Sequence, residues 1–239
     1  MRILCLHGMG TNSKNLGAGD ADMYMAFLDT AHFITRTDLN AAALRHQLGH
    51  SQSHKYEYVD GAEPIPPAPG IEAFIGQDES LAYYNPNSAQ SILTAIDDLW
   101  EYIAEEGPFD GVLGFSQGAS LAAMIIARAR HSNPPPFQFA IFFCAGLPYC
   151  EKSLTAGEIK FLRDEDTQGP IIHVPTAHIY GKKDPDVSYS KAMTGLCHPW
   201  GKVLLDHGAG HEIPRVPVEI VDDMARAVEK VVTKAVIGQ

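Results

Sequence analysis

A serine lies between two glycines in the segment GFSQG at 114–118, which follows the apolar run 109–113 and precedes a helical pattern over 117–130. This G-x-S-x-G spacing is typical of a nucleophile on a tight strand-to-helix turn, where strained dihedral angles lift the serine Oγ above a sheet. By chance the pattern arises in roughly one chain in ten of this size. The apolar strand before it and the helix after it make it more specific, so Ser116 is the candidate nucleophile.

A serine hydroxyl barely ionises at neutral pH, so it needs a base within reach and a third group that orients the base. In chains with this motif the acid comes next and the histidine last. The segment HIYGKKDPDVSYS offers Asp184, the first carboxylate past a predicted strand and our preferred acid, and Asp186, which also suits a helix cap. The segment LLDHGAGHEIPR offers His211, deeper in a glycine-bearing loop and our preferred base, and His207, which we expect to bond locally.

Acyl transfer also needs hydrogen-bond donors for the oxyanion that develops in the transition state. The backbone N–H of Gln117, directly after the serine, is one candidate. The second is the backbone N–H of Met9 in the loop LHGMGTN, where Gly8 and Gly10 permit close approach of the backbone, and where we expect His7 to tie the loop down. The sequence has no metal-ligand spacing such as H-E-x-x-H, so we expect neither a metal site nor a cofactor.

Alternating strands and helices are expected to position these side chains. Strands are predicted at RILCLHG, YEYVDGA, FDGVL, FQFAIFFCAG, TAHIYG and KVLLD, and helices over 41–49, 88–106, 117–130, 187–196 and 217–236. The stretch 151–170 is predicted to be irregular, and the prolines after residue 61 exclude regular structure at the start of 61–87. This alternation favours βαβ units and a mostly parallel sheet wrapped by helices. Because no linker divides the chain, we expect one domain, 1–239.

The composition argues against several classes of protein. A net charge of -11 and a pI near 5.4 argue against a nucleic-acid partner. No stretch approaches the about eighteen apolar residues of a membrane span, and the apolar run in MRILCLHG is too short for a signal-peptide core. The four cysteines lack C-x-x-C spacing and the density of a disulfide scaffold. We therefore expect a cytoplasmic protein with reduced thiols.

The segments LCLHG, GFSQGA, GKKDPDV and HGAGHEIP together resemble the fungal family of serine hydrolases related to the human ovarian-cancer-associated protein 2. The resemblance spans nearly the whole chain, including YEYVDGAEPIPPAPGI. It implies the α/β-hydrolase fold, a mostly parallel central sheet with helices on both faces, and a triad of Ser116, Asp184 and His211. The chain looks especially similar to the branch of polyketide-releasing thioesterases, as in the lovastatin pathway, which implies the acyl carrier domain of a polyketide synthase as partner.

One segment departs from the family pattern, because about 26 extra residues, Asn15 to Asn40, follow the HG loop. We interpret this insertion as a lid or as a surface excursion. A third interpretation is that it comes from an atypically spliced or mispredicted gene product, which would have impaired activity. The hydrophobic, aromatic segment from Phe74 to Tyr84 is expected either to line a binding site for an acyl chain or to cover the hydrophobic core.

Three functional hypotheses follow from these patterns. The first is a serine hydrolase that cleaves an acyl thioester or ester through a Ser116 acyl-enzyme and releases a polyketide chain from an acyl carrier protein in fungal secondary metabolism. The second is a general small-molecule carboxylesterase with no carrier partner. The third is a catalytically impaired family member that acts as a binding module. The complete triad favours an enzyme, whereas the insertion favours the third hypothesis.

Overall fold

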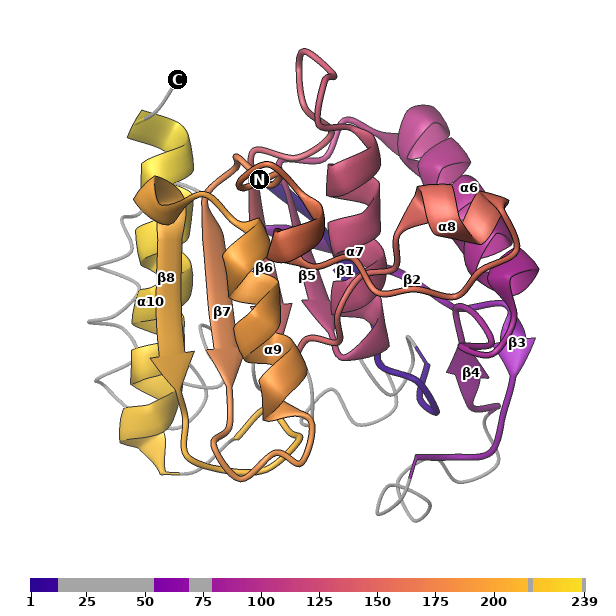
Figure 1. Ribbon diagram of the computed structural model, residues 1–239. Coiled ribbons are helices and arrows are strands. Elements are labelled where there is room, and N and C mark those ends of the chain that lie inside the picture. Colours follow the sequence, from indigo (N-terminus) through magenta and orange to yellow (C-terminus); the bar gives the residue numbers. More distant parts are fainter. Residues whose placement is uncertain (13–53, 69–78, 215–216, 238–239) are drawn as a thin grey trace.

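A six-stranded parallel sheet forms the centre of the molecule in the computed structural model, which describes residues 1–12, 54–68, 79–214 and 217–237 (Figure 1). Every neighbouring pair of strands in this sheet is parallel. In spatial order the strands are β2 (Lys55–Val59), β1 (Arg2–Leu6), β5 (Gly111–Phe115), β6 (Phe139–Phe143), β7 (Thr176–Tyr180) and β8 (Lys202–Asp206).

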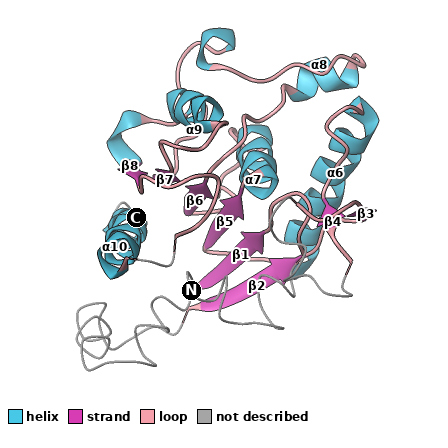
Figure 2. Ribbon diagram, turned by 90° about the horizontal axis from the view of Figure 1, so that it is seen from below, coloured by secondary structure: helices cyan, strands magenta, loops and turns pink. Residues whose placement is uncertain are grey.

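Helices cover both faces of the sheet, as the view along the strands shows (Figure 2). One face packs against α6 (Ala89–Glu106), α7 (Gln117–Arg128), α8 (Glu151–Thr155) and α9 (Val187–Met193), and the other against α10 (Val218–Ile237). Three short 3-10 helices complete the described helical segments: η1 (Asp164–Asp166), η2 (Thr194–Leu196) and η3 (Pro199–Gly201). Among the helices that the structure describes, none combines the length and the hydropathy that a bilayer span requires.

The central strands are apolar along their whole length because both faces of the sheet are covered. In β6 the side chains of Phe139, Ile141 and Phe143 pack toward α10, while those of Ala140 and Phe142 pack toward the helices of the opposite face. All five side chains are buried. This two-sided burial explains why the sequence shows a continuous apolar run here instead of alternation.

Helix α6 shows how local sequence sets the bounds of an element. The Ser88 side chain accepts a hydrogen bond from the Ser91 N–H and so caps the start of the helix, and Gly107 ends it with its N–H donating to the Ile103 carbonyl. Its apolar side chains recur at helical spacing and are buried at Ile92, Ala95, Ile96 and Leu99. The helix predicted over 88–106 is therefore present.

Short elements lie in the stretch 151–170, which was predicted to be irregular, and in 61–87, where the prolines were predicted to exclude regular structure at the start. Residues 151–170 include α8 and η1, and the segment 61–87 includes β3 (Glu63–Pro64) and β4 (Leu81–Ala82), which pair antiparallel. Strand β3 lies at the start of 61–87 and corrects the prediction. A strand of two residues is too short to show a periodic pattern of apolar side chains. Its pairing depends on contacts that are distant in sequence. The insertion at 15–40 and the helix predicted over 41–49 lie outside the described residues.

The carboxyl ends of the parallel strands all lie at one edge of the sheet. Ser116 follows β5, and the loops that carry the candidate acid, base and oxyanion donor follow β7, β8 and β1. The ends of β1 and β5 are level, since Leu6 lies opposite Gly114 in the ladder, and Tyr180 of β7 lies opposite Asp206 of β8. The topology thus gathers all the sequence-predicted site residues at the carboxyl edge, where open α/β sheets form their sites.

Candidate active site

Ser116 occupies a strained turn between β5 and α7. Its φ is 52° and its ψ is -112°, a left-handed conformation that residues other than glycine rarely adopt. The surrounding backbone holds it there, because the Ser116 N–H donates to the Phe143 carbonyl over 2.9 Å and the Ser116 carbonyl accepts from the Ser120 N–H. Strain of this kind persists only where neighbouring structure enforces it, and here it places the hydroxyl at the sheet edge.

The two glycines of the motif are required by close contacts on either side of the serine. A Cβ on Gly114 would lie 2.5 Å from the Ala119 backbone, and a Cβ on Gly118 would lie 2.4 Å from the Leu6 carbonyl oxygen. The Gly118 N–H also donates to the His7 carbonyl over 3.1 Å. The first turn of α7 therefore packs directly on β5 and β1, which is the physical reason for glycine at both positions.

Ser116, His211 and Asp184 form a continuous chain of hydrogen bonds. His211 Nε2 lies 2.9 Å from Ser116 Oγ, and His211 Nδ1 lies 2.7 Å from Asp184 Oδ2. With the carboxylate ionised, Nδ1 carries the proton and donates to Asp184, which leaves Nε2 to accept the serine proton. The Asp184 side chain is 0% exposed and that of His211 33%, so a buried anion orients a base that solvent and substrate can reach.

The loop after β7 fixes Asp184 and leaves Asp186 outside this chain of hydrogen bonds. The second carboxylate oxygen of Asp184, Oδ1, accepts the backbone N–H of Asp186 over 2.8 Å. Asp186 itself is exposed at the N-cap of α9, and its side chain makes no capping hydrogen bond. The structure therefore places the sequence-preferred aspartate, and not its alternative, against His211.

The loop that carries His211 is bonded to the loop that carries Asp184. The Lys183 N–H donates to the Ala209 carbonyl over 3.0 Å, and a Cβ on Gly181 would lie 2.0 Å from that same oxygen. His207 is buried at the start of this loop; its N–H donates to the Tyr180 carbonyl and its Nδ1 accepts from the Ala209 N–H. Burial lowers the pKa of His207. As expected, His207 bonds locally while His211 reaches Ser116.

Cys144 lies close to the His211–Asp184 pair, whereas the sequence predicted only that it is a reduced thiol. It follows β6 with a φ of 44°, and its Sγ donates to the Glu212 carbonyl over 3.5 Å. Burial, followed by the nearby Asp184 carboxylate, raises its pKa to about 12, so the group stays a protonated thiol. Its Sγ, a carboxylate oxygen of Asp184 and a ring nitrogen of His211 lie within 4.8 Å of one another. Such a thiol is a poor metal ligand, and it supports the residue after His211 instead.

The loop after β1 passes beside the nucleophile. A Cβ on Gly8 would lie 2.7 Å from the Phe115 ring and 3.5 Å from Ser116 Cβ, so only a glycine permits this approach. Met9, the next residue of this loop, has an exposed side chain. Gln117 is the first residue of α7, so its N–H has no intrahelical acceptor and lies at the positive end of the helix dipole. Gln117 therefore follows Ser116 directly in the chain, and the loop that carries Met9 passes close to Ser116 at Gly8.

His7 holds this loop through both nitrogens of its buried ring. Nδ1 donates to the Gly8 carbonyl over 2.6 Å, and Nε2 accepts the Gly61 N–H over 2.8 Å. Burial lowers the pKa of His7, which keeps the ring in this neutral tautomer. The tie that the sequence suggested for His7 is therefore made by two hydrogen bonds.

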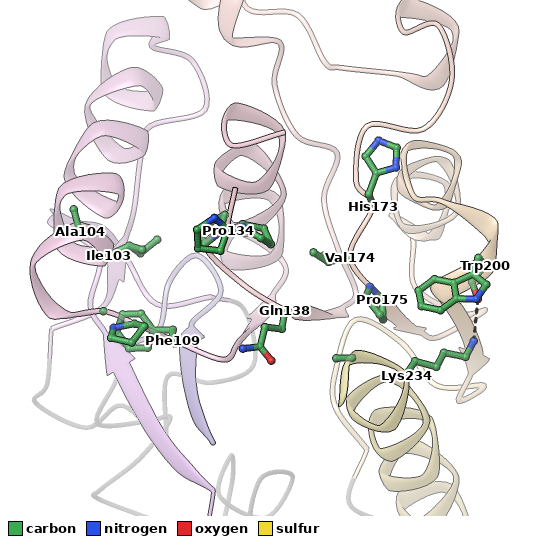
Figure 3. Close-up of a pocket in the computed structure, with 15 residues that line it drawn as sticks. Ile103, Ala104, Phe109, Pro134, Gln138, His173, Val174, Pro175, Trp200 and Lys234 are labelled. Atoms are coloured by element: carbon green, nitrogen blue, oxygen red, sulfur yellow. Dashed lines mark hydrogen bonds between the residues drawn. The ribbon is translucent and has the colours of Figure 1, made fainter. Parts of the chain in front are cut away.

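A cavity of about 840 Å³ lies at the opposite edge of the sheet (Figure 3). Its lining residues include Phe109, Pro134, Val174, Pro175 and Trp200, which precede the central strands instead of following them. Figure 3 shows these side chains around the opening, with Lys234 bonded to the Trp200 carbonyl. The cavity is therefore separate from the group around Ser116.

Comparisons with known proteins identify the family of this chain. The family model described as serine hydrolase (FSH1) matches residues 1–220. An esterase of Fusarium mangiferae, FPY3, is 82% identical over 239 residues and covers 100% of both chains. The esterase OVCA2 of Xenopus tropicalis is 34% identical over 234 residues, covering 90% of this chain and 86% of its own. These three results confirm the resemblance seen in the motifs.

A solved structure shows the same architecture. The carboxylesterase of Mesorhizobium loti superposes with a TM-score of 0.54 over 95% of this chain and 88% of its own, at 13% sequence identity. At that identity the likeness concerns the fold alone. It confirms the predicted α/β-hydrolase fold, with a mostly parallel sheet and helices on both faces.

Proposed function

The chain belongs to the serine hydrolase (FSH1) family and acts on ester bonds, and from this premise we propose that it cleaves acyl esters and thioesters through an acyl-enzyme on Ser116. The observation that carries the proposal is the unbroken chain from Ser116 Oγ through both nitrogens of His211 to Asp184, at 2.9 and 2.7 Å. Acyl transfer by a serine needs a nucleophile that is hydrogen-bonded to a base, and an anion that orients the base.

The first half of the reaction transfers the acyl group to the enzyme. Ser116 Oγ attacks the acyl carbon while His211 Nε2 takes its proton, and Asp184 stabilises the imidazolium that forms. The carbonyl oxygen becomes an oxyanion and accepts hydrogen bonds from the backbone N–H groups of Gln117 and Met9. When the tetrahedral intermediate collapses, the bond to the alcohol or thiol breaks and the leaving group takes the proton from His211.

The second half of the reaction releases the acid. A water molecule enters beside His211, which is accessible from solvent, and Nε2 takes its proton as the oxygen attacks the acyl carbon. The same backbone donors stabilise the second oxyanion. Collapse breaks the bond to Ser116 Oγ, which regains its proton from His211, and the free carboxylic acid leaves.

We further propose that the acyl donor is a thioester and that the enzyme releases a polyketide chain from an acyl carrier domain. The resemblance of the motifs to the polyketide-releasing branch of the family supports this assignment. The exposed side chain of Met9 and the partly exposed ring of His211 support it as well, since a tethered acyl chain has to reach Ser116 from outside. A thiolate is also a better leaving group than an alkoxide.

One set of rate measurements tests this function. The same acid is presented as a p-nitrophenyl ester, as an N-acetylcysteamine thioester and as a thioester on an acyl carrier protein, with Ser116→Ala as the blank. We expect hydrolysis of all three by the wild type, none by Ser116→Ala, and a kcat/KM at least about 10-fold higher for the carrier thioester than for the small thioester, since contacts remote from the reacting bond contribute binding energy.

The other outcomes support the alternatives. Equal kcat/KM for the carrier and the small thioester would contradict the carrier partner and favour a general carboxylesterase. A folded wild-type protein that hydrolyses none of the three would favour a binding module. Activity retained by Ser116→Ala would contradict the assignment of the nucleophile.

A further inference from the structure

The residues from Leu81 to Tyr84 connect the two parts of the proposed oxyanion hole. On one side they bond to the loop after β1: the Gly10 N–H donates to the Leu81 carbonyl over 2.9 Å, and the Leu81 N–H donates to the Thr11 carbonyl over 2.8 Å. Both bonds hold the two residues that directly follow Met9. The position of that loop therefore depends on the position of β4.

On the other side the same segment bonds to the first residue of the nucleophile helix. The Gln117 side chain is buried, its Oε1 accepts the Tyr83 N–H over 2.8 Å, and its Nε2 donates to the Tyr84 carbonyl over 2.9 Å. Gln117 thus carries a candidate oxyanion donor on its backbone and holds the connecting segment with its side chain. Both polar atoms of a buried amide are satisfied, so the arrangement is rigid.

Tyr83 reaches back to the loop with its hydroxyl. Its Oη accepts the His7 N–H over 2.9 Å and donates to the Val59 carbonyl over 2.6 Å. The ring stacks on His7 with centroids 4.5 Å apart. Burial raises the pKa of Tyr83 well above its ordinary value, so the hydroxyl keeps its proton and both bonds persist. Tyr83 and Tyr84 belong to the hydrophobic core, which fits a core cover and not an open acyl wall for this part of the aromatic segment.

We propose that Tyr83 is a positioning residue for the oxyanion hole. Its backbone N–H binds the helix side through Gln117 and its hydroxyl binds the loop side through His7, so one residue sets the spacing between the amides of Gln117 and Met9. Oxyanion donors act only when both lie about 2.7–3.1 Å from the developing charge. The inference rests on the proposed function, since it needs an acyl-transfer reaction at Ser116.

The test is Tyr83→Phe, which keeps the ring and its stacking on His7 but removes the hydroxyl. We expect kcat for the p-nitrophenyl ester to fall about 10- to 30-fold, less than the roughly 100- to 1,000-fold that follows deletion of a donor, because the amides are displaced and not lost. KM should change less than about 3-fold. The Ki of a trifluoromethyl ketone, which forms an oxyanion adduct with the serine, should rise by the factor by which kcat/KM falls.

Two further variants sharpen the test. Tyr102→Phe is the matched control, because it removes a tyrosine hydroxyl that is bonded to Glu57 and lies away from Ser116; its kcat should stay within about 2-fold of the wild type. Gln117→Met removes the other link and should also lower kcat. The double variant Tyr83→Phe/Gln117→Met should lose less than the product of the two single losses, since both act on the same amides.

The outcomes separate this inference from the function beneath it. If Tyr83→Phe keeps the wild-type kcat and Ki while Ser116→Ala is inactive, the positioning role is wrong and the function stands. A loss of activity with an unchanged Ki would also overturn it, since that points to general damage. If circular dichroism shows that Tyr83→Phe does not fold, Gln117→Met decides by the same two readouts. An inactive wild type would overturn the proposed function and this inference with it.

Discussion

Asp184 acts on His211 from a fully buried position, and this burial determines what its carboxylate contributes. One oxygen accepts the His211 Nδ1–H and the other accepts the Asp186 N–H, so both are bonded although the side chain is not exposed to solvent. Charge-assisted hydrogen bonds in such surroundings are shorter and stronger than neutral ones. Asp184 can therefore fix the tautomer of His211 and stabilise its charged form during the reaction.

Substitution of each aspartate by asparagine tests this role at the residue scale. Asp184→Asn should lower kcat by about 10⁴-fold, the loss seen when the orienting aspartate of a serine protease triad becomes an amide and the histidine takes the wrong tautomer. Asp186→Asn should change kcat less than about 2-fold, since the Asp186 side chain is exposed and does not cap α9. Steady-state kinetics on a p-nitrophenyl ester decide between them, and a larger loss at 186 would reverse the assignment.

The sequence was informative about residues whose partners are specified by a motif. Ser116 follows from the glycine spacing, and the order of acid and histidine along the chain pointed to Asp184 and His211. It did not point to the side chain of Gln117 or the hydroxyl of Tyr83, because their hydrogen-bond partners lie 24 to 76 residues away in the chain and no motif specifies them. The position of Cys144 close to the His211–Asp184 pair could not be predicted from the sequence either, since it depends on the order of strands in the sheet.

At the scale of elements, the site depends on how closely α7 approaches β1. Gly118 lies in the first turn of the helix, and its α-carbon faces the carbonyl oxygens of Leu6 and His7. Because one of these residues ends β1 and the other begins the loop of the second oxyanion donor, the same contact sets the height of Ser116 and the position of that loop.

Gly118→Ala should separate these elements. The new Cβ would lie 2.4 and 2.5 Å from two backbone oxygens that cannot rotate away, so we expect a loss of at least about 2 kcal/mol in the free energy of unfolding and a fall in kcat. Gly146→Ala is the matched control, since its Cβ would meet Ser120 Cβ at an ordinary 3.7 Å. Urea unfolding measures both. Equal stability of the two variants would show that α7 can shift without cost.

The long elements could be predicted, whereas the short ones could not. Central strands such as β6 are recognisable because two-sided burial leaves a continuous apolar run, and α6 because its apolar side chains repeat at helical spacing. The strands β3 and β4 have two residues each and pair with each other, and β4 also bonds to the loop after β1 at Leu81. Those contacts are properties of the folded chain and leave no local pattern.

At the scale of the whole molecule, the parallel sheet separates two edges with different character. The carboxyl edge gathers loops from β1, β5, β7 and β8 around Ser116, while the amino edge holds the apolar cavity near Trp200. Alternation of strands and helices was enough to predict the first arrangement, since parallel strands must end together. The cavity depends on the packing of prolines and loop backbone, for which the sequence has no comparable signal. The single-domain and cytoplasmic assignments stay predictions.

Activation of Ser116 by His211 underlies every step of the proposed reaction, and covalent labelling of the serine measures it. A fluorophosphonate probe is incubated with the wild type and with folded Ser116→Ala and His211→Ala variants, and the adduct is located by peptide mass spectrometry. We expect one adduct on Ser116 in the wild type, none at that position in Ser116→Ala, and much slower labelling of His211→Ala, because only an activated serine reacts rapidly. A folded wild type that stays unlabelled, or that carries the probe on another residue, would contradict it.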